Sequence, residues 1–202
     1  MNGIMSLPLQ TGSSVPITTR LDGDQVHCVD HLIGVFNHVF LKRNQTCLVG
    51  GGDEPEYLPA EAASGYHRII FTRDYYASAL HEIAHWCIAG SERRLLPDYG
   101  YWYAPDGRTA QQQRDFEQVE IKPQALEWLF SMACGYRFRV SADNLNAHTG
   151  PSIEFKCAIV DQAKNYCKSM PDRPKLLIET LEHVYQTTDT CNPGLYTVQA
   201  LE

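Results

Sequence analysis

The chain has 202 residues, of which 44% are hydrophobic and 20% charged, a composition typical of one globular domain with a sizeable core. Its formal net charge of −7 argues against non-specific binding to nucleic acid, and no stretch of the sequence approaches the length of a membrane span. The seven cysteines are an odd number and form no C-x-x-C pair, so we expect a reducing, cytoplasmic environment rather than a disulfide framework.

The N-terminal quarter of the chain divides into an irregular start and the first regular elements. Residues 1–24 lack hydrophobic periodicity and are predicted to be a flexible extension ahead of a single domain at residues 25–202. Apolar residues recur at helical spacing from about 24 to 42, and a strand is predicted at 46–49. This strand runs into residues 50–52, three glycines that let the backbone approach a ligand or another segment closely.

The remainder of the chain is mostly helical in pattern. A short apolar run predicts a strand at 67–72, and helical spacing predicts helices at 74–89 and 109–134. Two further helices are predicted at 152–169 and 173–186, where prolines separate them. These elements together indicate a helix-rich α+β domain with a small sheet.

The pentapeptide His-Glu-Ile-Ala-His at residues 81–85 carries the strongest functional signal in the chain. Residues four apart lie on the same face of a helix, so His81 and His85 are within reach of one metal ion, with the carboxylate of Glu82 beside it. A helix with two half-buried histidines and a surface glutamate is the structural alternative. An apolar stripe at helical spacing favours the metal site, because it places the histidines beside the core-facing side, near a cleft.

A third ligand is expected from another segment, because two histidines alone hold a metal weakly. The predicted helix at 109–134 carries Glu117, Glu120 and Glu127 near one face. We predict Glu120 as the third ligand, with Glu117 as the alternative. Gln124, one turn after Glu120, is predicted to hydrogen-bond a ligand histidine. Two histidines and one carboxylate leave the remaining positions of the ion for water, substrate or oxygen.

A second pair of histidines has the same spacing without the same context. His27 and His31 are four residues apart, but Cys28 follows His27 at the position where Glu82 follows His81. We therefore predict a solvated helix flank for this pair. Cys87, which adjoins the predicted metal site, is predicted to be a small core residue.

The ligand set is compatible with more than one reaction. With zinc, Glu82 would deprotonate a bound water that attacks a peptide carbonyl, as in His-Glu-x-x-His peptidases. With ferrous iron, the same two histidines and one carboxylate leave room for dioxygen and for hydroxylation of a C–H bond. Glu82 would then orient a water or a substrate amine.

Four segments resemble the bacterial elongation factor P hydroxylase family: GDEPEYLPA at 52–60, YYASALHEIAHWCIAG at 75–90, GYWYAPDGR at 100–108 and EQVEIKPQAL at 117–126. The resemblance extends from about residue 25 to the C-terminus. It implies hydroxylation of the modified lysine of elongation factor P, after a β-lysyl group has been attached. It also implies Fe(II) as the working metal, O2 as co-substrate, and a fold other than the jelly roll of 2-oxoglutarate oxygenases. By position, the implied metal ligands are His81, His85 and Glu120.

Two further segments acquire predicted roles from this resemblance. Asp53 and Glu54 are expected to attract the cationic lysyl amines, with a solvated acidic loop as the alternative. An aromatic segment is expected to line a channel for the lysine stem, with core packing as the alternative, and an arginine after it is expected to pair locally or contact the partner protein. These residues are Tyr101, Trp102, Tyr103 and Arg108.

Two other functions stay open beside the hydroxylase. One is a zinc metallopeptidase, which the His-Glu-x-x-His motif by itself favours. The other is a non-catalytic binder of a translation factor that a metal, zinc for example, merely stabilises. A closed site with four protein ligands would favour this binder, whereas the sequence offers three plausible ligands.

Overall fold

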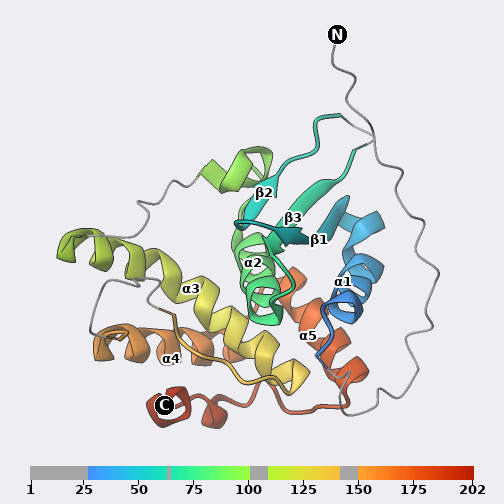
Figure 1. Cartoon of the computed structure of the whole chain (residues 1–202). Helices are drawn as coiled ribbons and strands as arrows, with labels where there is room; N and C mark the ends of the chain where they lie inside the picture. Colours follow the sequence, from blue (N-terminus) through green and yellow to red (C-terminus); the bar gives the residue numbers. More distant parts are fainter. Residues whose placement is uncertain (1–26, 63–64, 101–108, 142–149) are drawn as a thin grey trace.

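The computed structural model describes residues 27–62, 65–100, 109–141 and 150–202. In this part of the chain, five α-helices pack beside a small three-stranded sheet (Figure 1). The predicted helix-rich α+β class with a small sheet is confirmed. The predicted extension at residues 1–24 lies outside the described residues. No helix among those described is both long and apolar enough to cross a bilayer.

The sheet consists of β1 (Thr46–Gly52), β2 (Glu56–Leu58) and β3 (His67–Thr72), in the order β1-β3-β2. The central strand β3 is parallel to β1 and antiparallel to β2. β1 and β3 lie where the sequence predicts strands, while β2 was not predicted. A side chain at Gly52 would meet Glu54 O and Ile70 Cγ2 at 2.8 Å, so the predicted close backbone approach occurs here.

All five predicted helices are present, with ends that differ from the prediction by a few residues at most positions. The first begins later than expected, because the chain becomes helical only at Val29 rather than near residue 24. Their bounds are α1 (Val29–Asn44), α2 (Tyr76–Ile88), α3 (Ala110–Cys134), α4 (Ile153–Lys168) and α5 (Asp172–Tyr185).

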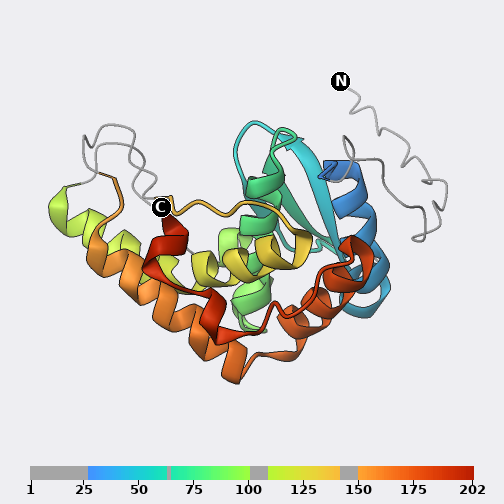
Figure 2. The ribbon, with the colours of Figure 1, turned by 90° about the horizontal axis from the view of Figure 1, so that it is seen from below.

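Helix α3 lies at the centre of the helical layer and contacts α2, α4 and α5 (Figures 1 and 2). Every residue from 123 to 131 on this helix is buried, because neighbouring helices pack against several sides of its second half. The first half of α3 is more polar and more exposed. Helix α2 packs between α3 and strand β3. Its Trp86 ring lies 5.4 Å from that of Phe36 and 4.9 Å from that of Phe40, both on α1. One face of α2 therefore packs in the hydrophobic core, and its other face contacts α3.

Candidate metal centre

Helix α2 presents His81 and His85 toward α3 because the opposite face is anchored in the core. Leu80, Ile83 and Ala84 are fully buried, whereas the side chains of His81 and His85 keep 26% and 13% of their surface exposed. The predicted position of the two histidines, beside the core-facing stripe, is therefore confirmed. Partial exposure leaves the imidazoles reachable by an ion and by solvent.

Helix α3 brings two carboxylates to the same place. Glu120 is 2% exposed and Glu127 is 8% exposed, although both carry an ionisable group. They are drawn inside because the apolar residues that follow Glu120, including Leu126 and Phe130, are fully buried in the core. A buried carboxylate is strongly unfavourable unless it has a cationic or hydrogen-bonding partner.

The side chains of His81, His85 and Glu120 converge on one point. The two Nε2 atoms lie 3.0 Å apart. Glu120 Oε2 lies 3.4 Å from His81 Nε2, and Glu120 Oε1 lies 3.3 Å from His85 Nε2. Ligand atoms that surround a single ion at bond lengths of about 2.1 Å are themselves separated by about 3.0 to 3.4 Å. The observed spacings therefore match three ligands of one metal ion.

The unsatisfied polar atoms of this cluster fit a metal as well. Glu120 Oε2 is buried and has no hydrogen-bond partner among the described residues. Two imidazole nitrogens that face each other need a proton or a cation between them, because their lone pairs otherwise repel. A divalent cation would satisfy the carboxylate and both imidazoles together, and this donor set suits zinc and ferrous iron.

The charges of the cluster are strongly coupled. Burial acts to lower the pKa of His81, but its hydrogen bond to Glu127 and the charges of Glu120 and Glu127 raise it to about 10. Burial acts to raise the pKa of Glu120, but the neighbouring His85 and His81 lower it to about 2. Glu120 is therefore a carboxylate at neutral pH, the form that a metal ion requires.

Glu127 orients one of the histidines. Its Oε2 accepts a hydrogen bond from His81 Nδ1 at 2.8 Å. This bond places the proton of the neutral imidazole on Nδ1 and leaves the Nε2 lone pair directed at His85 and Glu120. A carboxylate behind a ligand histidine is the usual second layer of a protein metal site.

The sequence of the chain is similar to those of known proteins. The family model described as elongation factor P hydroxylase matches residues 35–194, which include the three converging side chains. The chain is also 49% identical over 176 residues to a Haemophilus influenzae protein named elongation factor P lysine hydroxylase. This alignment covers 87% of the present chain and 99% of that protein. The chain belongs to the elongation factor P hydroxylase family.

In this family member, Gln124 does not hydrogen-bond the ligand histidine as predicted. Its amide instead makes two bonds to the backbone of Ser141: Nε2 donates to the carbonyl at 2.7 Å, and Oε1 accepts from the N–H at 3.1 Å. It therefore ties the segment after α3 back onto that helix. The role expected of Gln124 is filled by Glu127, which lies two helical turns after Glu120 on the same face.

Glu117, the alternative third ligand, lies away from the cluster. Its Oε2 accepts a hydrogen bond from Ser152 Oγ at 3.0 Å. The same hydroxyl accepts from Phe155 N and so caps the N-terminus of α4. Within the described ranges, the residues that come together as possible metal ligands are His81, His85 and Glu120.

Glu82 is half-buried next to the cluster, and burial raises the pKa of its carboxyl group while the nearby His85 and His81 act to lower it. Asp53 and Glu54 are exposed in the turn after β1. Cys87 is buried, as predicted, and all seven cysteines are free. The remaining residues predicted to contact the substrate lie outside the described residues: Tyr101, Trp102, Tyr103 and Arg108.

Proposed function

We propose that this chain hydroxylates a lysine of elongation factor P at a metal ion held by His81, His85 and Glu120. The convergence of these three side chains at ligand spacing carries the proposal. Membership of the hydroxylase family, and 49% identity to a protein named elongation factor P lysine hydroxylase, support the reaction and its substrate. We assign the hydroxylase domain to residues 25–202 and treat residues 1–24 as an extension.

Ferrous iron is the metal that we propose for this site, with O2 as the co-substrate. Iron, when bound, supplies the dioxygen chemistry, and a set of two histidines and one carboxylate leaves coordination positions open for it. Glu120 contributes a negative charge that stays ionised, since its pKa lies near 2. Glu127 keeps His81 in the tautomer that binds through Nε2.

We assign Glu82 a catalytic role beside the metal. Glu82 is half-buried and follows the proposed ligand His81 directly in the sequence, and burial raises the pKa of its carboxyl group. A carboxyl group in such a position can hold or pass on a proton, or orient a water or a substrate amine. In the peptidase alternative, the same carboxylate would deprotonate the attacking water.

The substrate that we propose is the β-lysylated lysine, whose amines are cationic. Asp53 and Glu54 are assigned to attract these amines, in keeping with their exposed position and negative charge. Tyr101, Trp102 and Tyr103 are assigned to the aliphatic stem of the lysine, and Arg108 to the docking of the partner.

The decisive experiment is aerobic incubation of the Fe(II)-loaded chain with elongation factor P that carries β-lysyl-lysine. Intact-protein mass spectrometry should detect a gain of one oxygen atom on elongation factor P, and fragmentation should place it on the modified lysine. Anaerobic samples and the His81→Ala variant should give no gain. Cleavage of elongation factor P without oxygen would instead establish the peptidase, and an unchanged mass under all conditions would leave only binding.

A further inference from the structure

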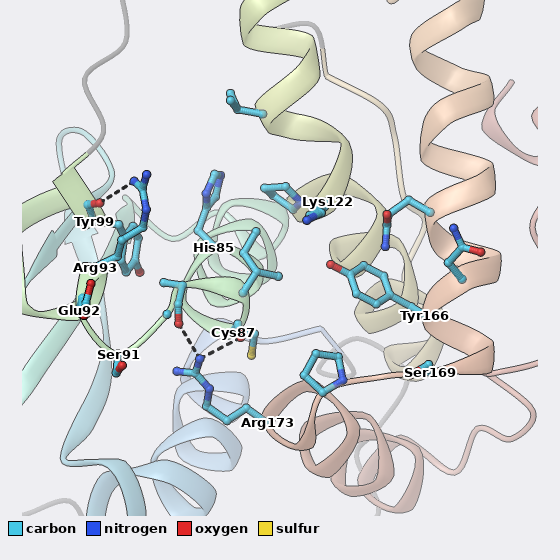
Figure 3. A pocket seen from close by; sticks show the side chains of 18 of the residues that line it. His85, Cys87, Ser91, Glu92, Arg93, Tyr99, Lys122, Tyr166, Ser169 and Arg173 are labelled. Carbon is cyan, nitrogen blue, oxygen red and sulfur yellow. Dashed lines mark hydrogen bonds between the residues drawn. The ribbon is translucent and has the colours of Figure 1, made fainter.

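A groove runs beside the metal centre between the C-terminal end of α2, the middle of α3 and the facing parts of α4 and α5 (Figure 3). Its volume is about 1000 Å³, and His85, one of the proposed ligands, lies in its wall. A small molecule in this groove would therefore lie next to the metal. The hydroxylation chemistry proposed above does not yet use this space.

The charge of the groove is opposite to that of the whole chain. Among its lining residues, Arg93, Lys122 and Arg173 are cationic and Glu92 alone is acidic, although the chain carries a net charge of −7. Such a wall repels the amines of a lysyl substrate and attracts an anion. Lys122 lies two residues after Glu120 on α3, and its exposed side chain lines the groove (Figure 3).

Arg173 is the most unusual member of this wall. Its Nη2 donates to Cys87 O at 3.0 Å and to Ala89 O at 2.7 Å, and its guanidinium carbon lies 4.7 Å from the centre of the Trp86 ring. Its Nη1 is buried without a hydrogen-bond partner in the described part of the chain. All of these contacts are with neutral groups, so no carboxylate of the described residues balances this partly buried cation.

A second guanidinium adds to the same excess of positive charge. Arg94 Nη1 also donates to Ala89 O, so two cations share one carbonyl oxygen, and burial together with the charge of Arg94 lowers the pKa of Arg173. The C-terminal end of α2 offers a partial negative charge of about half an elementary unit, which offsets only part of this sum. An anion in the groove would offset the remainder.

Neutral hydrogen-bonding groups also line the groove. The hydroxyl of Tyr166 on α4 points into the groove (Figure 3), and burial raises the pKa of this phenol to about 12, so it remains a donor. Asn165 and Ser169 are further polar residues of the lining. Such groups recognise the oxygen atoms of a polar ligand.

Hydroxylation of a C–H bond by dioxygen requires a partner that gives up two electrons. One oxygen atom enters the new C–O–H group, and the other must be reduced to water by two electrons and two protons or be taken up by a co-substrate. Resting on the proposed function, we infer that the groove binds this electron donor, a small organic acid whose negative charge is held by the cationic side chains of Lys122 and Arg173.

Two kinds of acid share this chemistry and balance the reaction differently. An ene-diol acid gives two electrons and two protons, becomes a dione, and leaves the second oxygen atom in water. A 2-oxo acid takes up the second oxygen atom itself, loses its carboxylate as CO2, and leaves as an acid one carbon shorter. Ascorbate and 2-oxoglutarate are the respective probes.

The test measures binding of each acid in the absence of turnover. The full chain is loaded with redox-inactive Zn²⁺ and titrated with each acid in a calorimeter. One of the two acids should bind with a 1:1 ratio. Lys122→Met should lower the affinity for this acid about tenfold, because one charge-assisted contact is lost. Arg173→Lys, which keeps the charge but loses the planar fork, should weaken it as well. Lys175→Met is the matched control, because Lys175 is exposed on α5 outside the groove.

Binding of neither acid to the unaltered chain, or equal affinity in Lys122→Met, would show that the groove does not bind the donor. With Fe(II) and lysylated elongation factor P, the acid that binds should be consumed once per oxygen atom inserted, and Lys122→Met should raise KM for the acid alone. Hydroxylation with neither acid bound would overturn only the role of the groove. An acid bound without any mass gain of elongation factor P would overturn the donor role and the proposed function together.

Discussion

Two pairs of histidines in this chain have the same spacing of four residues, yet among the described residues only one pair faces carboxylates. His81 and His85 lie opposite Glu120 and Glu127 of α3. His27 lies just before α1, where its Nε2 bonds to Cys134 O at 2.9 Å and its ring packs against three tyrosines: Tyr76, Tyr136 and Tyr185. The spacing in the sequence is thus the same, but His27 lies outside a helix whereas His81 and His85 both lie within α2, and the elements that face the two pairs differ.

The comparison indicates that the opposing surface, rather than the sequence spacing alone, decides whether two histidines are placed to hold a metal ion. Burial lowers the pKa of His31, while the carboxylates around His81 raise its pKa to about 10. A site that attracts protons in this way also attracts a metal cation, since both are held by the same negative charge. The predicted solvated flank was wrong for His27 and His31, which are both half-buried and in contact with tyrosine rings.

The largest expected effect comes from removing a ligand of the carboxylate-facing pair. Glu120→Gln, His81→Ala and His85→Ala should each weaken metal binding by more than about 100-fold, beyond the loss typical of a residue behind the ligands, and should abolish hydroxylation. Competition with a chromogenic chelator measures the affinity. Glu117→Gln is the matched control, because Glu117 lies on the same helix as Glu120 but accepts a hydrogen bond from Ser152 at the start of α4. Retained affinity in any one ligand variant would remove that residue from the site.

The effect of pH should have opposite signs in the metal-free and metal-loaded protein. The pKa of His81 is raised from 6.5 to about 10, so the metal-free fold is stabilised by its protonation below pH 6.5 and loses this stabilisation as pH rises toward 10. Metal binding displaces that proton, so the metal-loaded protein should gain stability over the same range. Thermal unfolding from pH 6.5 to pH 9.5 tests both slopes, and parallel slopes would contradict the assignment of His81 as a ligand.

Glu127 should have an intermediate effect, because it acts on the metal through His81. Glu127→Gln keeps the shape of the side chain but loses the charge that holds the Nδ1 proton, and metal affinity should fall about 10- to 100-fold. Asp115→Asn, an exposed change earlier on α3, is the control. An affinity equal to that of the unaltered chain would show that the bond to His81 has no influence on the metal.

The smallest effect on the metal is expected from the tyrosine-facing pair. His27→Ala should leave metal affinity unchanged, although the loss of the bond to Cys134 O and of the ring contacts should lower the free energy of unfolding by about 1 to 2 kcal/mol. Urea unfolding and chelator competition on the same samples separate the two quantities. A tenfold loss of metal affinity here would break the distinction between the two pairs.

The sequence by itself determined the parts of this protein that depend on local periodicity. The strand at 67–72 has the bounds that its apolar run predicts, and the helix of Glu120 extends over 110–134 where 109–134 was predicted. The spacing of His81 and His85 required only that they share a helix, since residues four apart then lie on one face. The resemblance to a known family added the choice of reaction.

The tertiary structure alone decided the contacts that depend on how helices cross. Glu127 rather than Gln124 meets His81, although both follow Glu120 on α3, because the crossing of α2 and α3 sets which turn of one helix faces which turn of the other. Strand β2 has three residues and one buried side chain, too little for a periodic signal, and it forms because β3 offers it an edge. The cationic groove and the surroundings of His27 arise from segments more than 80 residues apart, which no local pattern brings together.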